Sequence, residues 1–293
     1  MNTSSFPTPQ RALVLGGGGS TGNAWLIGVV AGLQAAGLDV SRADLTVGTS
    51  AGSTAAAQLT TTSAQELYAA ILDAPDTGAR PAANRPVSEH MTRIQGIIDS
   101  CDSLEQLHRA MSSAALGLPG ADEPEFSERW RGIVAARFPG AQWPKGRTLK
   151  LTAVDASAGK PVVFENHSGV DLADAVAASC SSSLPYWLDG RAYIDGGYRR
   201  NENADLAQGC AKVLVLSPLG GRTLHPLAWG SGLDAQVNEL REGGSQVRAL
   251  LPDEPAQPFM GANAMNPALR PAAAREGHRQ GRDAAAQLAQ FWG

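Results

Sequence analysis

The sequence has 293 residues, of which 43% are hydrophobic and 18% are charged, so it is long enough for one large α/β domain or for a domain with an inserted cap. Its formal net charge is −4 and no basic footprint argues for nucleic acid, so we expect no nucleic-acid partner. Its three cysteines show neither a disulfide pattern nor a metal-binding spacing, which is typical of reduced thiols in a cytoplasmic protein.

The first ten residues are polar and include two prolines, but they lack a basic segment followed by an apolar core. We therefore predict that residues 1–10 form a disordered lead-in and not a signal peptide. The longest apolar stretch, Ala24–Ala36, contains Gln34 and two glycines and is too short to span a bilayer. Any contact with a membrane is expected to be peripheral.

Two strand–helix units open the chain. Arg11–Leu15 is predicted to be a short strand, and Ser20–Ala36 has a helical pattern that Gly37 ends as a C-cap. Asp44–Val47 is a second strand pattern, and we expect a helix over Ser50–Thr62. This β-α-β-α order predicts a parallel sheet covered by helices.

The segment 72–146 breaks this alternation because it is rich in proline and glycine. Between these residues lie two helical patterns, Val87–Leu116 and Phe126–Phe138. We interpret 72–146 as a helical insertion, a candidate lid or cap over the sheet. Ordinary helices that flank the sheet are the alternative.

Strand patterns resume after the insertion. Thr148–Val154 and Pro161–Glu165 are predicted to form an antiparallel pair, with Gly159 in the turn between them. The remaining predicted elements are a short helix at Asp171–Ala178, strands at Arg191–Ile194, Lys212–Leu216 and Ser245–Leu251, and a terminal helix at Leu269–Trp292. Residues 11–293 are therefore predicted to form one α/β domain.

Two glycine-bracketed turns follow the first two strands. Gly48-Thr49-Ser50-Ala51-Gly52 has the G-x-S-x-G form of a nucleophile elbow, a sharp strand-to-helix turn that presents a serine. The earlier turn, Gly17-Gly18-Gly19-Ser20-Thr21-Gly22, offers backbone N–H groups to an oxyanion. Together the two turns indicate a serine hydrolase rather than a binding module.

A serine nucleophile needs a base that takes its proton. In the Ser–acid–His order of α/β-hydrolases, only His225 or His278 could follow an acid such as Asp195, and each has the sequence context of a surface histidine. The turn Asp195-Gly196-Gly197 offers another solution, because an aspartate held by a glycine pair can approach a serine closely and act as the base itself.

The order of three motifs resembles the patatin-like phospholipase family: Gly17-Gly18-Gly19-x-x-Gly22, then Gly48-Thr49-Ser50-Ala51-Gly52, then Asp195-Gly196-Gly197. The segment 172–185 is similar to that family's helix and A-S-x-x-x-P loop, and Asn201 fits the asparagine that follows its D-G-G. The resemblance covers about 11–62 and 148–216.

The resemblance implies a patatin-like three-layer α/β domain with a central, mostly parallel sheet flanked by helices. It implies a Ser50–Asp195 dyad without a catalytic histidine, and an oxyanion hole formed by the N–H groups of Gly17, Gly18 and Gly19. The glycines that would support these motifs are Gly22, Gly48, Gly52, Gly196 and Gly197. The family acts on lipid acyl esters, including phospholipids, lysophospholipids and acylglycerols, so a lipid or acyl-ester substrate is expected and no cofactor or metal is implied.

The chain departs from the family at two positions. Family members commonly carry Arg or Lys where this chain has Thr21, and the absence of that cation weakens the case for a phospholipid head group. Many relatives have proline where this chain has Asn203.

Two alternatives to a hydrolase use the same residues. Gly17-x-Gly19-x-x-Gly22 is also a dinucleotide-binding Rossmann fingerprint, with Asp39 near the place of a ribose-binding acid. That alternative leaves Ser50 and the Asp195-Gly196-Gly197 turn unexplained. The second alternative is a catalytically inactive relative that binds lipid.

Two residue pairs near the candidate site have a functional and a plainer interpretation. Tyr186-Trp187 would line an acyl pocket or would only pack in the core. Arg199-Arg200 would contact anionic lipid or would be a solvated surface pair.

Overall fold

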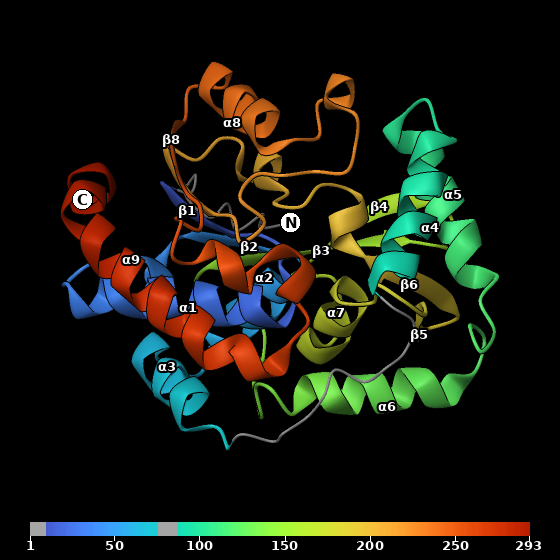
Figure 1. The fold of residues 1–293 in the computed structure, drawn as a ribbon, viewed down its shortest axis with the longest axis horizontal. Coiled ribbons are helices and arrows are strands. Elements are labelled where there is room, and N and C mark those ends of the chain that lie inside the picture. Colours follow the sequence, from blue (N-terminus) through green and yellow to red (C-terminus); the bar gives the residue numbers. More distant parts are fainter. Residues whose placement is uncertain (1–9, 76–86) are drawn as a thin grey trace, which may run out of the picture.

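The computed structural model describes residues 10–75 and 87–293 as one three-layer α/β domain (Figure 1). The residues 1–9 of the expected lead-in lie outside the described residues. The strands are β1 (Arg11–Leu15), β2 (Leu45–Gly48), β3 (Thr148–Asp155), β4 (Lys160–Glu165), β5 (Tyr186–Leu188), β6 (Arg191–Asp195), β7 (Lys212–Leu216) and β8 (Gln246–Leu250). The helices are α1 (Gly19–Ala35), α2 (Ala51–Gln58), α3 (Ala64–Asp73), α4 (Val87–Asp99), α5 (Leu104–Leu116), α6 (Pro124–Ala135), α7 (Leu172–Ser179), α8 (Leu233–Glu242) and α9 (Arg270–Trp292).

The eight strands form one sheet in the order β5-β6-β3-β2-β1-β7-β8, with β4 paired to β3. The pairs among β3, β2, β1, β7 and β8 are parallel, whereas β4, β5 and β6 join by antiparallel pairs. This confirms the predicted mostly parallel sheet between helices and the antiparallel pair β3–β4. The strands β1 and β7 are short apolar runs because buried cores lie on both of their faces.

Alternate residues of β1 face the two helical layers. Leu13 and Leu15 belong to the main core, which also contains α1, α2, α7 and α9. Ala12 and Val14 belong to a second core on the opposite face, beneath α8 and the short helix Ala204–Ala207. This period of two is what a β-strand dictates for a sheet with two covered faces. The strand β1 therefore lies between two apolar cores.

The predicted insertion contains α4, α5 and α6. The pattern Val87–Leu116 was predicted as one stretch of helix, and the structure divides it into α4 and α5, because Ser103 caps a new helix by accepting a hydrogen bond from the Gln106 N–H. A third apolar cluster joins α4 and α5 to Val154 of β3 and to β6. The two helices thus cover the antiparallel end of the sheet, and their action as a cap stays a prediction.

Other differences concern elements with weak patterns. The helix predicted over Ser50–Thr62 ends at Gln58, and α3, α8 and β5 were not predicted. The helix α3 starts with a capping box, in which Ser63 and Glu66 satisfy each other's backbone N–H groups. Within the described ranges, no helix combines the length and the hydropathy needed to cross a bilayer.

Candidate active site

The strand β3 pairs with both strands that lead to the candidate catalytic residues, β2 before Ser50 and β6 ending at Asp195. The first half of β3 pairs with β2, so that Gly48 lies opposite Leu151. The second half pairs with β6, so that Asp195 lies opposite Ala153. Because β2 is parallel to β3 and β6 is antiparallel to it, the carboxyl ends of β2 and β6 converge. Ser50 and Asp195 therefore meet above one short stretch of β3.

The nucleophile elbow, residues 48–52, forms the turn that its sequence predicts. Ser50 has φ 52° and ψ −113°, a conformation that costs a non-glycine residue about 1–3 kcal/mol. Its N–H donates to the Ser179 hydroxyl oxygen (2.9 Å), and its carbonyl oxygen accepts from the hydroxyl of Ser53 (2.6 Å) and the thiol of Cys180 (3.2 Å). These bonds hold the strained turn in place.

The glycines of the elbow are needed because the backbone passes close by on both sides. A Cβ atom on Gly52 would lie 1.9 Å from the Leu15 carbonyl oxygen, and one on Gly48 would lie 2.8 Å from the Ser53 Cα atom. Any side chain at these two positions would force β1, β2 and α2 apart, so the elbow requires glycine at both.

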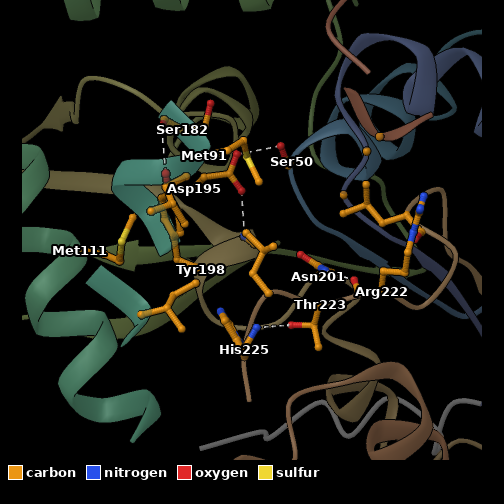
Figure 2. A pocket seen from close by; sticks show the side chains of 18 of the residues that line it. Ser50, Met91, Met111, Ser182, Asp195, Tyr198, Asn201, Arg222, Thr223 and His225 are labelled. Atoms are coloured by element: carbon orange, nitrogen blue, oxygen red, sulfur yellow. Dashed lines mark hydrogen bonds between the residues drawn. The ribbon is translucent and has the colours of Figure 1, made fainter. Parts of the chain in front are cut away.

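The Ser50 hydroxyl donates a hydrogen bond to Asp195 Oδ2 at 2.7 Å (Figure 2). The other carboxylate oxygen, Oδ1, accepts the Gly197 N–H at 2.8 Å. Burial raises the pKa of Asp195 to about 6, although the hydrogen bonds from Gly197 and Ser50 oppose this shift. Gly196 lets this turn press against β3, since its Cβ would lie 2.2 Å from Thr152 Oγ1. A serine hydroxyl thus faces a desolvated carboxylate that can accept its proton.

The glycine loop, residues 16–22, lies beside Ser50. The Gly17 N–H donates to the Asn201 carbonyl oxygen at 2.9 Å and is therefore occupied in this structure. In the described parts of the chain, the N–H groups of Gly18 and Gly19 have no hydrogen-bond partner. Gly22 is buried, and its Cβ would lie 3.1 Å from Pro218. Of the three predicted oxyanion donors, the Gly17 N–H is therefore occupied, whereas the N–H groups of Gly18 and Gly19 are free within the described residues.

The two histidines of the triad alternative do not contact the Ser50–Asp195 pair. His225 Nδ1 shares a hydrogen bond with the Ser231 hydroxyl at 3.0 Å, and burial lowers the pKa of His225 to about 4. His278 lies on α9 with its ring stacked on Tyr68. His225 lines the same cavity as Ser50, but the serine's hydrogen bond goes to Asp195.

The pair opens into a cavity of about 1100 Å³ (Figure 2). Its wall is mostly apolar, and it is built from α4 and α5 on one side and the loop 219–227 on the other. The apolar side chains that line it include Met91, Ile98, Leu107, Met111, Leu224 and Leu227. Among the described residues that line the cavity, Arg222 is the single arginine or lysine, and Asp195 is the single carboxylate.

Tyr186 and Trp187 do not line this cavity. Tyr186 is buried and its hydroxyl donates to Asp174, and the Trp187 indole N–H donates to the Ala121 carbonyl oxygen at 2.6 Å. Their role in the described structure is packing.

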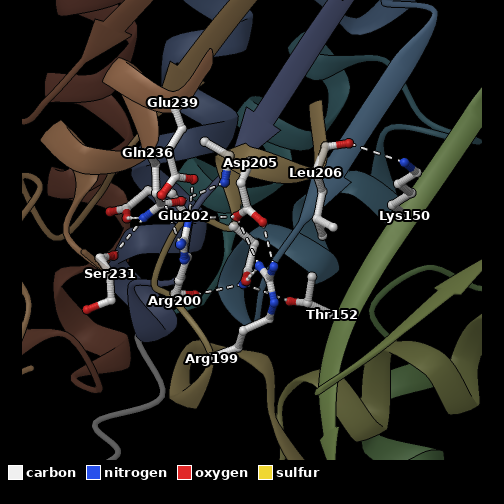
Figure 3. Close-up of polar contacts among 12 residues, drawn as sticks. Lys150, Thr152, Arg199, Arg200, Glu202, Asp205, Leu206, Ser231, Gln236 and Glu239 are labelled. Carbon is white, nitrogen blue, oxygen red and sulfur yellow. Dashed lines mark hydrogen bonds and ion pairs between the residues drawn. The ribbon is translucent and has the colours of Figure 1, made fainter. Parts of the chain in front are cut away.

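Arg199 and Arg200 are engaged in ion pairs, as Figure 3 shows. Arg199 binds Asp205, and Arg200 binds Glu239 at 2.7 Å and Asp205 at 3.4 Å. Both guanidinium groups are largely buried. These surroundings do not favour the contact with anionic lipid that was one of two interpretations of the pair.

The dinucleotide interpretation has little support in the geometry. Asp39 caps the short helix Val40–Arg42, where it accepts the Ser41 N–H at 3.0 Å, instead of ending a strand. Pro218 lies over the glycine turn, because a Cβ on Gly18 would be 2.5 Å from its Cβ. The side chain of Pro218 therefore occupies the space beside the turn.

A protein-family model described as patatin-like phospholipase matches residues 13–207, more than half of the chain and both members of the Ser50–Asp195 pair. The chain belongs to the patatin-like phospholipase family. Membership of this family supports a lipid hydrolase function. The helices α8 and α9 and the strands β7 and β8 lie beyond the matched residues.

Two solved structures align with 97% of the chain. VipD from Legionella pneumophila is 13% identical, with 68% of its own chain covered and a TM-score of 0.45. The type III effector protein ExoU is 16% identical, with 54% of its own chain covered and a TM-score of 0.37. No curated protein sequence matches this patatin-like chain.

Sequence reasoning noted Asn203 only as a departure from the family and did not consider Arg270, although both residues contact segments of this patatin-like site. The Asn203 side chain is fully buried and its amide donates to Thr49 Oγ1 (2.9 Å), Thr152 Oγ1 (3.1 Å) and the Gly196 carbonyl oxygen (3.2 Å). It thereby joins Thr49, the residue before Ser50, to Gly196, the residue after Asp195. Arg270 of α9 binds the glycine loop. No local pattern marks either residue, because each acts through segments that are distant in the sequence.

Proposed function

We propose that the protein is a serine acyl-ester hydrolase that cleaves lipid or phospholipid esters with Ser50 as nucleophile and Asp195 as base. The observation that carries this proposal is the 2.7 Å hydrogen bond from the Ser50 hydroxyl to Asp195 at the floor of an apolar cavity. The family supports a lipid substrate, and the strained serine fits the geometry of a nucleophile elbow.

In the acylation step, Ser50 Oγ attacks the carbonyl carbon of the ester while Asp195 Oδ2 accepts the hydroxyl proton. The carbonyl oxygen becomes an oxyanion, for which Gly18 and Gly19 offer free N–H groups. The N–H of Ala51, the residue after the nucleophile, is a further candidate donor. The tetrahedral intermediate then collapses, the C–O bond to the alcohol breaks, and the alcohol leaves with the proton held by Asp195.

In the deacylation step, a water molecule takes the place of Ser50 as the nucleophile, and Asp195 again acts as the base. A water molecule attacks the acyl-enzyme carbonyl while Asp195 accepts one of its protons, and the same N–H groups hold the second oxyanion. The proton returns to Ser50 Oγ as the fatty acid leaves. No histidine is required, which agrees with the contacts of the two rings: His225 is hydrogen-bonded to Ser231 and His278 is stacked on Tyr68.

The cavity supports a long apolar acyl group. Met91 and Ile98 of α4 and Leu107 and Met111 of α5 line it, so an acyl chain would be buried against these two helices. Arg222 is the one lysine or arginine among the described lining residues, and the low pKa of His225 leaves that ring neutral at pH 7. These features favour an ester with a neutral or zwitterionic head group over one with several negative charges.

We also propose that the protein meets lipid aggregates at the mouth of this cavity. Leu227 is 82% exposed, and Leu224 and Met91 are exposed cavity residues as well. These side chains define the apolar rim, residues 91, 224 and 227, which continues into the cavity wall. Peripheral contact through this rim would let an acyl chain pass from a lipid surface to Ser50 without crossing water.

The test is release of free fatty acid from mixed micelles of an acylglycerol or of phosphatidylcholine, with the wild type compared to Ser50→Ala. The wild type is expected to release fatty acid and the variant to release none above background. Equal rates for the two proteins, or no release from any lipid by well-folded wild type, would contradict the proposal. The second result would favour the inactive lipid-binding alternative.

A further inference from the structure

The terminal helix α9 brings a cation to the glycine loop. Arg270 is the first residue of α9, and its Nη1 group donates to the Ser20 carbonyl oxygen at 2.7 Å. Its Nη2 group donates to Asn23 Oδ1 at 3.1 Å, and the Asn23 amide in turn donates to the Ala51 carbonyl oxygen at 3.4 Å. One guanidinium group is thus linked both to the glycine loop and to the first residue of the helix after Ser50.

The position of Arg270 is fixed by unusually close packing of α9 along α1, which lie side by side in Figure 1. A Cβ on Gly28 would lie 2.2 Å from the Ala274 carbonyl oxygen, and one on Gly281 would lie 2.3 Å from the Val29 carbonyl oxygen. Since residue 28 meets 274 and residue 32 meets 278, the two helices run parallel. Their N-termini therefore lie together at the glycine loop.

The charge of Arg270 is uncompensated. Within the described residues, no carboxylate lies at ion-pair distance from it; its partners are the Ser20 carbonyl and hydroxyl oxygens and Asn23 Oδ1. Burial, with a smaller effect from the positive charge of Arg137, lowers the pKa of Arg270 to about 10. The first turns of α1 and α9 contain no acidic residue, although both helix dipoles point their positive ends here. Such a region is complementary to a negative charge that develops beside it.

The glycine loop, residues 16–22, contains no lysine or arginine. Thr21 is buried, and its hydroxyl donates to the Phe259 carbonyl oxygen at 2.6 Å. The Thr21 N–H donates to the Ala264 carbonyl oxygen at 2.9 Å. The loop is therefore held from outside the family-matched residues, by the segment 259–270.

We propose that Arg270 is a positioning residue for the oxyanion hole: by binding the Ser20 carbonyl and Asn23, it holds the free N–H groups of Gly18 and Gly19 in place, and its charge favours the oxyanion. This inference rests on the proposed Ser50 esterase function. It assigns a working part in catalysis to α9, which lies beyond the residues that the family model matches.

The experiment compares wild type, Arg270→Gln and Arg270→Lys, with Arg275→Gln as the matched control. Arg275 is an exposed arginine of the same helix, so its replacement removes the same charge without touching the loop. For each protein we would measure kcat and KM on a short soluble ester, the rate at which a fluorophosphonate labels Ser50, and the thermal unfolding midpoint.

We expect Arg270→Gln to lower kcat and the labelling rate about 10- to 100-fold with KM within about 2-fold of wild type, a smaller loss than removal of an oxyanion donor itself. Arg270→Lys should recover part of kcat because it restores the charge, and Arg275→Gln should match the wild type. A purely structural role would lower the unfolding midpoint without this split between kcat and KM.

Wild-type kcat in folded Arg270→Gln would overturn the inference. If that variant does not fold, Arg270→Lys decides: full kcat would overturn the inference, and a reduced kcat at unchanged KM would support it. Absence of labelling of Ser50 in the wild type would instead be a failure of the proposed function, so the two failures are distinguishable.

Discussion

The Ser50 hydroxyl and the Asp195 carboxylate are joined by a hydrogen bond of 2.7 Å although 145 positions separate them in the chain. The contact exists because β3 pairs with β2 along its first half and with β6 along its second half. The parallel strand β2 and the antiparallel strand β6 thus end at neighbouring positions along β3, opposite Leu151 and Ala153. Among the described residues, this geometry places the carboxylate of Asp195, and not a histidine ring, at hydrogen-bond distance from the Ser50 hydroxyl.

Replacing Asp195 by Asn should lower kcat about 10²- to 10⁴-fold, the usual contribution of a general base. The substitution keeps the shape of the side chain and the acceptor for the Gly197 N–H. Steady-state kinetics on a soluble ester measures the effect, with His225→Ala as the control that should retain activity. Loss of activity in His225→Ala together with full activity in Asp195→Asn would support a triad instead.

The Asp195→Asn variant should be more stable than the wild type at pH 8. Burial raises the folded-state pKa of Asp195 from 3.8 to about 6, so the free energy of unfolding falls as the pH rises between these two values, and the full cost of the buried charge is present at pH 8. Asparagine cannot ionise, and we expect the free energy of unfolding to rise by about 1–3 kcal/mol. Denaturant unfolding at pH 8 checks this value. A large loss of stability would mean that the activity loss reflects misfolding.

The activity should depend on pH through Asp195. Below about pH 6 the carboxyl group is protonated and cannot accept the Ser50 proton, so kcat/KM should rise with pH and level off above about pH 7. The profile of kcat/KM from pH 4.5 to 9 measures this. The inflection should remain in His225→Ala; an inflection that disappears in that variant would assign it to the histidine.

Asn203 should resist replacement by the proline that many family members carry. Its φ is 55°, in the left-handed region, whereas proline fixes φ near −65°, so Asn203→Pro should lose about 3 kcal/mol or more. Asn203→Gly accepts this φ but loses the amide bonds to Thr49, Thr152 and Gly196, and should lose about 1–3 kcal/mol. Chemical denaturation of the three proteins tests both values. Equal stability of Asn203→Pro and wild type would contradict the described backbone.

The cavity should set the preferred acyl length. Met111 of α5 lines it, and a tryptophan there would fill part of the space that an acyl chain needs. Met111→Trp should therefore shift the preference of kcat/KM toward shorter acyl groups while hydrolysis of an acetyl or butyryl ester stays unchanged. A series of p-nitrophenyl esters measures the shift. An unchanged profile would mean that the acyl chain binds elsewhere.

The apolar rim should control binding to lipid. Replacing both Leu224 and Leu227 by serine should reduce co-sedimentation with phosphatidylcholine vesicles roughly 10-fold or more, because each leucine contributes on the order of 1 kcal/mol when it is buried in lipid. Ile133→Ser is the matched control, since Ile133 is exposed on α6 and does not line the cavity. Turnover of a soluble ester should stay unchanged. Vesicle binding that falls equally in the control would remove the rim from the proposal.

The sequence permitted accurate prediction of features that are local. The strand and helix patterns around the two glycine turns, the elbow at Ser50 and the turn at Asp195 depend on neighbouring residues, and the structure has them as expected. The split between α4 and α5 was not predictable from periodicity, because both helices have similar apolar patterns and only the cap at Ser103 marks the boundary.

Apart from the Ser50–Asp195 pair, which the family resemblance implied, contacts between distant segments were beyond sequence reasoning. The Gly17 N–H is occupied by a carbonyl oxygen from residue 201, and Arg270 reaches Ser20 only because α9 lies parallel to α1. In each case the deciding partner lies in another element, and no spacing in the chain reveals it.

The most direct measurement is intact-mass labelling of the wild type, Ser50→Ala and Asp195→Asn by a fluorophosphonate. Because the reagent reacts with an activated serine, the wild type should gain the mass of one adduct, Ser50→Ala should gain none, and Asp195→Asn should react at least about 100-fold more slowly. An adduct that persists in Ser50→Ala, or a wild-type labelling rate in Asp195→Asn, would contradict the Ser50–Asp195 dyad.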